Sequence, residues 1–316
     1  MNSDTEDLLL DALRNFSRFA FHLLWFSKNS PIDASFQQLR NSVLSLPEAE
    51  RIKYAKEIEF VRSIPLDRLH DIIFPYPTGT CQADSSKETE AGKRNGLPYV
   101  VHKGKELYFP KNFTTKEACD AYHWLIDAEG LTGDGKREKS PHCYQTADFH
   151  VESGDVLLDI GCAEALFALD NIDMIKAAYV FECASRWRKP LQATFERYFP
   201  KTNIISKFVS DRSTRGTITL HDAMQTRLEG NEHFFVKMDI EGGERDVIRG
   251  NADFFRKNKV KLSCCVYHRQ DDDVVIDKML RELGYSTSFS SGFMLTGMNG
   301  IHFPYFRHGV IYAKNY

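Results

Sequence analysis

The feature that most constrains the fold is a regular alternation of strand-like and helical stretches from residue 155 onward. Helices are predicted between most of the strands, at about 164–176, 187–199, 243–257 and 271–283. Such alternation predicts a parallel sheet with helices on both faces. The strand-like runs are VLLDI (156–160), YVFE (179–182), IISKFVS (204–210), FFVKMDI (234–240) and KLSCCVYH (261–268).

The end of the chain follows a different pattern. After Gly284, the runs YSTSFSS, GFML and GVIYAK follow one another without helical stretches between them. Consecutive strands that lack a crossover helix are typical of antiparallel pairing. These runs therefore predict an antiparallel edge on the otherwise parallel sheet.

Polar residues stand at the end of each of the five predicted strands. In an open α/β sheet, ligands bind beyond the carboxyl ends of the strands, where the strand order reverses. Five consecutive ends of this kind are a more specific signal than any one of them, and they predict a ligand crevice. The residues are Asp159 and Gly161, Glu182, Ser210 and Asp211, Asp239 and Glu241, and His268 with Arg269.

The loop after the first strand argues against a dinucleotide. That ligand needs G-x-G-x-x-G, because its pyrophosphate must approach bare backbone. Here Gly161 is followed by Ala163 and Leu166 at the other two glycine positions. S-adenosylmethionine (SAM) has no phosphate and needs only one close backbone approach, so the loop favours SAM over NAD or FAD.

Individual residues can be matched to parts of SAM. Glu182 lies 21 residues past Gly161, where an acidic side chain can accept hydrogen bonds from both ribose hydroxyls. Asp211 is expected near the adenine amino group, and Asp159 near the methionine portion. Each also has a purely structural interpretation, such as a turn or a first-turn helix carboxylate. The predicted cofactor-binding residues are Asp159, Gly161, Cys162, Glu164, Glu182, Ser210, Asp211, Asp239 and Glu241.

Several stretches resemble the FkbM family of SAM-dependent methyltransferases, over about 155–316 and more loosely from 99. They are DIGCAEALFAL (159–169), VKMDIEGGERDVIRG (236–250), YHRQDD (267–272), GYSTSFSSGFML (284–295) and PYFRHGVIYA (304–313). The family's first motif is similar to Asp-x-Gly-Ala-x-x-Gly, whereas this chain has Cys162 at the Ala position and Ala165 at the second Gly. The resemblance implies a Rossmann-like class I fold with a mostly parallel seven-stranded sheet. It also implies methyl transfer to oxygen, mostly on hydroxyls of sugars or secondary metabolites.

A hydroxyl acceptor needs a base, and two strand-end residues are candidates. His268 has a suitable side chain because an imidazole titrates near neutrality, although it could equally be a structural strand-end residue. Asp239 is the second candidate. Together with Glu241, these residues could also bind a divalent metal, but the sequence favours a metal-free site. Arg269, Arg307 and His308 are weaker candidates for contact with an anionic acceptor.

Three hypotheses remain open from the sequence. The first is an O-methyltransferase that acts on a sugar, glycoconjugate or secondary metabolite. The second is a methyltransferase for nitrogen or another small-molecule acceptor, with the same cofactor site. The third is a non-catalytic module that binds SAM or a partner and docks through its N-terminal helices. The departure at Ala165 keeps the third hypothesis open.

Four regions are predicted along the chain. Residues 1–75 form a helical N-terminal region, and 76–98 form a linker rich in Pro, Gly, Ser and charge. Residues 99–150 hold a hairpin and a helix, whose start is predicted at Thr114 from a capping box with Glu117. Residues 151–316 form the methyltransferase domain.

Composition limits the partners and the compartment. The net charge of −3 is well mixed in sign, which argues against nucleic acid as a partner. The apolar run at 8–26 is interrupted by charges, so no integral membrane segment is predicted. Seven cysteines without a CxxC pair argue against zinc and favour a reducing, cytoplasmic compartment. The expected partner is a small-molecule or glycan acceptor, and the oligomeric state is left open.

Overall fold

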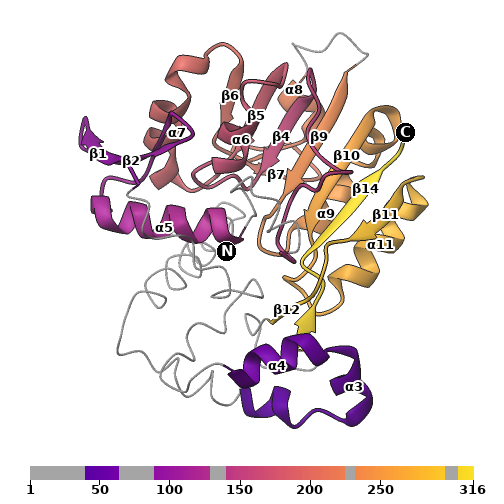
Figure 1. The fold of residues 1–316 in the computed structure, drawn as a ribbon. Coiled ribbons are helices and arrows are strands. Elements are labelled where there is room, and N and C mark those ends of the chain that lie inside the picture. Colours follow the sequence, from indigo (N-terminus) through magenta and orange to yellow (C-terminus); the bar gives the residue numbers. More distant parts are fainter. Residues whose placement is uncertain (1–39, 64–88, 129–139, 225–231, 296–304) are drawn as a thin grey trace, which may run out of the picture. The chain divides into compact units, whose positions relative to one another are not determined.

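The structure is a computed structural model that describes residues 40–63, 89–128, 140–224, 232–295 and 305–316 (Figure 1). The chain divides into two compact units, 1–73 and 74–316. The predicted amphipathic helix at 8–26 and most of the predicted linker lie outside the described residues. The four predicted region boundaries remain predictions.

The first unit contains two described helices, α3 (Glu48–Lys53) and α4 (Ala55–Ser63). Helix α3 begins directly after Pro47, because a proline fixes the backbone at the start of a helix without losing a helical hydrogen bond. Helix α4 buries Ile58 and Val61. This part of the chain therefore has an apolar core of its own.

The second unit is built on a seven-stranded sheet in the order β11-β14-β10-β9-β4-β5-β6 (Figure 1). All neighbouring pairs are parallel except the two that involve β14. The strands are β4 (Val156–Ile160), β5 (Ala177–Phe181), β6 (Thr202–Ile205), β9 (His233–Met238), β10 (Lys259–Cys265), β11 (Ser286–Phe289) and β14 (Val310–Lys314). This order confirms the predicted mostly parallel sheet with an antiparallel edge.

The burial of the central strands explains why the sequence pattern predicted them correctly. Every residue of β4 is buried, and β9 and β10 are buried except at their first residues. Strands covered on both faces become continuous apolar runs. The chain moves from β4 toward β6 on one side of the sheet, and from β9 toward β10 on the other. Because crossovers are right-handed, these two directions place their helices on opposite faces.

The helices between the strands are shorter than predicted. They are α6 (Leu166–Asn171), α7 (Arg188–Phe195), α9 (Glu244–Gly250), α10 (Ala252–Lys257) and α11 (Asp272–Glu282). The stretch predicted as one helix at 243–257 breaks at Asn251. The Asn251 side chain accepts a hydrogen bond from Leu220 N (2.8 Å) and donates one to Ser210 O (3.0 Å). This side chain therefore ties the break to a neighbouring segment.

Two predicted strands differ from the structure. The run at 204–210 is divided between β6 and β7 (Phe208–Val209), and β7 pairs with β8 (Thr217–Ile218) outside the main sheet. The run GFML forms β12 (Met294–Leu295), which pairs only with β13 (Phe306–Arg307). A β-rich stretch does not reveal its pairing partner, because pairing depends on residues distant in sequence.

A three-stranded antiparallel sheet precedes the main sheet in sequence. It consists of β1 (Ala91–Arg94), β2 (Leu97–His102) and β3 (Lys105–Tyr108). The predicted hairpin is confirmed, but β1 lies inside the stretch predicted as linker. Helix α5 (Thr115–Ala128) follows. Its capping box is confirmed, because Thr114 N donates to Glu117 Oε2 (2.7 Å) and Glu117 N donates to Thr114 Oγ1 (3.2 Å).

Candidate functional site

The strand order reverses between β4 and β9, and this is where a ligand crevice is expected. Gly161 follows β4 and Asp239 follows β9 at this position. A Cβ atom on Gly161 would lie 2.0 Å from the Asp239 carbonyl oxygen, and the Gly161 φ of +77° is in the left-handed region. Only glycine fits there. The two strand ends are therefore in close contact, as the sequence predicts.

The loop after β4 has two alanines in left-handed conformations, Ala163 (φ +46°) and Ala165 (φ +61°). This conformation costs an L-residue with a side chain roughly 1–2 kcal/mol. Ala165 occupies the position at which the family pattern has its second glycine. The loop nevertheless closes tightly, since Ala165 N donates to Cys162 O (2.6 Å). The departure from the family pattern therefore adds strain and leaves the turn intact.

Glu182 follows β5 and lies beside this loop, as predicted. Its Oε2 accepts a hydrogen bond from Ala163 N (3.0 Å) and its Oε1 accepts one from Ala184 N (2.8 Å). The residue is only 4% exposed. The carboxylate thus links the first loop to the segment after β5. Each carboxylate oxygen has two acceptor sites, so further hydrogen bonds can form.

Two more predicted residues lie close to Lys237. Asp159 is wholly buried, and its Oδ1 lies 3.2 Å from Lys237 Nζ, which also donates to Gly161 O (2.8 Å). Burial raises the pKa of the Asp159 carboxyl, against the opposing charge of Lys237. Burial also raises the pKa of Glu164 to about 7. Asp159 therefore supports the loop through Lys237, and its burial argues against direct contact with a ligand.

Asp239 lies at the centre of a polar cluster. Tyr144 Oη donates to Asp239 Oδ2 (2.9 Å), and Tyr267 Oη donates to Oδ1 (3.3 Å). His142 Nε2 lies 3.7 Å from Oδ2, and His268 Nε2 lies 3.3 Å from Oδ1. Burial alone would raise the pKa of this carboxyl, but the contact with His142 and the charge of His268 hold it well below its usual range.

His268 lies among three carboxylates. Its Nδ1 is 2.9 Å from Glu244 Oε1, and its Nε2 is 3.6 Å from Glu241 Oε2 in addition to the Asp239 contact. Burial lowers the pKa of the imidazole, but Glu244, Glu241 and Asp239 raise it to about 9. The ring is therefore protonated at neutral pH. A protonated imidazole cannot accept a proton.

Ser210 and Asp211 do not directly follow a strand of the main sheet. The third strand of the main sheet ends at Ile205, so both residues lie beyond it, after β7. The Asp211 backbone packs against the end of α9, because a Cβ on Gly250 would lie 2.2 Å from Asp211 Cα. The predicted contact of Asp211 with the adenine amino group stays a prediction, although the predicted strand before it is divided.

Three residues of the cluster had no role in the sequence analysis. His142 and Tyr144 come from the segment before β4, and both are buried against Asp239. Lys237 is a buried lysine inside an apolar strand. A lysine in such a run was a visible signal, because an unpaired charge is rarely buried. No local pattern could have connected His142 with a residue 97 positions away.

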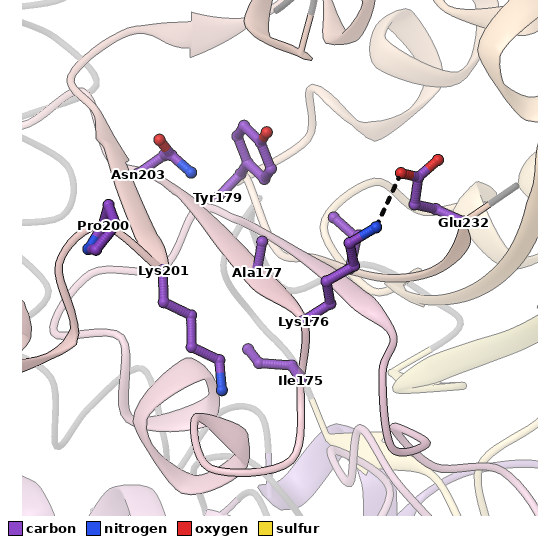
Figure 2. A pocket seen from close by; sticks show the side chains of 9 residues that line it. Ile175, Lys176, Ala177, Tyr179, Pro200, Lys201, Asn203 and Glu232 are labelled. Atoms are coloured by element: carbon purple, nitrogen blue, oxygen red, sulfur yellow. Dashed lines mark hydrogen bonds and ion pairs between the residues drawn. The ribbon is translucent and has the colours of Figure 1, made fainter. Parts of the chain in front are cut away.

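A separate pocket lies on the side of the sheet opposite the candidate site, where the parallel strands begin. It is lined by residues at the amino ends of β4, β5, β6 and β9, among them Lys176, Lys201 and Asn203 (Figure 2). Lys176 Nζ lies 3.4 Å from Glu232 Oε1 across it. Because ligands of such folds bind at the carboxyl ends, this pocket is distinct from the candidate site.

The strand order, the antiparallel β14 and the loop at the reversal point define a Rossmann-like class I methyltransferase fold. Residues 178–287 match the family model of the methyltransferase FkbM domain. This match agrees with the resemblance seen in the sequence, and it covers about a third of the chain. The matched range begins inside β5, so β4 and its strained loop lie outside it.

Solved structures with similar folds include two methyltransferases. Methyltransferase FkbM from Methylobacillus flagellatus KT has a TM-score of 0.43 and 17% identity, over 61% of this chain and 52% of that one. Precorrin-6y C5,15-methyltransferase from Geobacter metallireducens GS-15 has a TM-score of 0.36 and 12% identity, over 53% and 81%. This chain therefore covers about half of the FkbM structure. No curated protein matches it.

Within the described ranges, no helix is both long and apolar enough to cross a membrane. The six cysteines in these ranges are all free thiols, and four of them are buried. They are Cys119, Cys143, Cys162, Cys183, Cys264 and Cys265.

Proposed function

We propose that the protein is a SAM-dependent methyltransferase that methylates a hydroxyl of a sugar, glycoconjugate or secondary metabolite. The observation that carries this proposal is the meeting of the Gly161 loop with the Asp239 cluster at the strand-order reversal of a methyltransferase fold. SAM supplies the methyl group and its leaving group when bound. The chain's own residues must bind the cofactor, orient the acceptor and remove a proton.

Several residues present at the crevice fit SAM. Glu182 is an acidic residue beside the first loop, and a carboxylate at this place is suited to accept hydrogen bonds from ribose hydroxyls. Gly161 leaves the backbone bare at the point where two strand ends meet. The carboxylates of Asp239 and Glu241 provide negative charge suited to a sulfonium cation. Cys162 and Glu164 line the same loop.

Asp239 is the proposed base for the acceptor hydroxyl. Its side chain is 18% exposed, whereas that of His268 is 3% exposed. An anionic carboxylate can accept the proton as the carbon–oxygen bond forms. Protonated His268 holds this carboxylate in place from one side, while the hydroxyls of Tyr144 and Tyr267 hold it from the other. His268 is thus a positioning residue in this proposal.

Calorimetry with SAM, its demethylated product and NAD tests the cofactor assignment. Binding of SAM and its product, without binding of NAD, supports the proposal. Binding of NAD alone would overturn it. Asp239→Asn should then keep most of the SAM affinity and lose methyl transfer to an identified acceptor, because the amide cannot take the proton.

A non-catalytic SAM-binding or partner-binding module is the second candidate. The strain at Ala163 and Ala165 favours it, since the family pattern has glycine at the position of Ala165. Transfer of the methyl group from SAM to any hydroxyl acceptor would exclude this candidate. For the location, we propose the cytoplasm, because buried free thiols suit a reducing compartment.

A further inference from the structure

We propose that Asp239, Glu241 and His268 bind a divalent cation, with Glu244 holding the imidazole from behind. The sequence favoured a metal-free site, but the arrangement of these four side chains argues otherwise. Their chemistry also suits a cation, since carboxylates and imidazole together are ligands for Mn²⁺, Fe²⁺ and Zn²⁺. Mn²⁺ serves as the probe below.

The first argument is the spacing of the ligand atoms. His268 Nε2 lies 3.3 Å from Asp239 Oδ1 and 3.6 Å from Glu241 Oε2. Ligands about 2.1 Å from an octahedral ion lie roughly 3 Å from their neighbours. The observed distances exceed this value by only a few tenths of an ångström. Both carboxylate oxygens therefore lie near ligand-to-ligand distance from His268 Nε2.

The second argument is the side chain behind the imidazole. His268 Nδ1 lies 2.9 Å from Oε1 of Glu244, a wholly buried carboxylate that also accepts a hydrogen bond from Ile240 N (2.9 Å). Without the cation the ring carries a proton on both nitrogens, so cation binding would release the Nε2 proton to solvent and keep the Nδ1 proton directed at Glu244. Metal-binding histidines commonly donate their other N–H to a carboxylate in this way. The ring is thus already oriented for a metal.

The third argument is the local excess of negative charge. Oε2 of Glu244 is buried and has no hydrogen-bond partner among the residues that the structure describes. Asp239, Glu244 and His268 bring ligand atoms within 4.8 Å of one another. The nearby cation Lys237 is paired with Asp159. A divalent cation between these groups would offset charge that the surrounding residues leave unbalanced.

Glu241 adds an observation from the backbone. Its φ of +59° is in the left-handed region, which a residue other than glycine adopts at a cost. Backbone strain of this kind is concentrated at functional sites. The next residue, Gly242, also has a positive φ, of +97°, which a glycine adopts without this cost. Placing a glutamate there keeps a carboxylate beside His268.

The role of the cation rests on the proposed function. It would lie next to Asp239, where the acceptor hydroxyl must approach the base. A hydroxyl coordinated to a divalent cation loses its proton more readily. The cation would therefore bind and orient the acceptor, and vicinal hydroxyls of a sugar would suit two neighbouring coordination positions.

The test is a titration of the metal-stripped full chain with Mn²⁺, in the absence of SAM, with free Mn²⁺ measured by electron paramagnetic resonance. We expect one Mn²⁺ per chain. Glu241→Gln should weaken binding at least tenfold, and the fold should tolerate this substitution because the Glu241 side chain is exposed. Glu244→Gln should weaken binding about 10–100-fold by releasing the imidazole. Glu282→Gln, an exposed carboxylate on α11, is the matched control and should bind as the wild type does.

Absence of Mn²⁺ binding by the wild-type chain at millimolar concentration would overturn the proposal. So would binding that is equally strong in Glu241→Gln, Glu244→Gln and the control. Calorimetry with SAM on the same samples separates this result from the proposed function. A chain that binds SAM but no Mn²⁺ refutes the metal site alone, whereas loss of SAM binding refutes the cofactor assignment.

Discussion

Replacing Glu164 with glutamine should make the protein less sensitive to alkaline pH. Glu164 is 6% exposed, and burial raises the pKa of its carboxyl from the usual 4.5 to about 7. The folded state therefore binds this proton more tightly than the unfolded state. The stabilisation is complete below about pH 4.5 and is lost as the pH rises through 7.

The size of the effect follows from the two pKa values. The difference between 4.5 and about 7 corresponds to roughly 3 kcal/mol once both states are ionised. Most of this difference develops between pH 5 and pH 8, so about 2–3 kcal/mol should be lost across that interval. Glutamine has nearly the same shape and cannot ionise, so the variant should escape this loss.

Urea unfolding of wild type and Glu164→Gln at pH 5 and pH 8 measures the effect. The free energy of unfolding of the variant, relative to wild type, should rise by about 2–3 kcal/mol between the two pH values. Glu196→Gln, an exposed glutamate on the same domain, should show no such change. If the difference between Glu164→Gln and wild type does not vary with pH, the Glu164 carboxyl is not held protonated and the reasoning fails.

Four further substitutions test the site. Gly161→Ala should lower the free energy of unfolding in urea by more than about 3 kcal/mol, because the added Cβ would lie 2.0 Å from a backbone oxygen. A variant as stable as wild type would contradict the close contact. Ala163→Gly should raise the melting temperature by a few degrees, as strain of about 1 kcal/mol is relieved. Glu182→Gln should fold but bind SAM more weakly in calorimetry, by roughly 1.5–3 kcal/mol; unchanged affinity would remove Glu182 from the cofactor site. His268→Ala should lower the free energy of unfolding by about 3–5 kcal/mol, because it leaves buried carboxylates unpaired. An unchanged free energy of unfolding would mean that His268 is not charged.

The sequence by itself determined the sheet and its central strands. Strand β4 was predicted to the residue, because a strand covered on both faces must be apolar throughout. The capping box at Thr114 was equally local, since both partners lie within one helical turn. The strand-end positions of Gly161, Glu182 and Asp239 followed from the same pattern. These features depend on neighbours in the sequence or on a repeating period.

Only the tertiary structure decided which partners these residues have. His142 reaches Asp239 from a segment before the first strand of the sheet, a contact that no period encodes. Ser210 and Asp211 do not follow a strand of the main sheet, because β7, which precedes them, pairs with β8 instead. The raised pKa of His268 has the same origin. The pKa of an imidazole is set by the charges around it, and here three carboxylates surround His268 only after the strands and their loops have packed together.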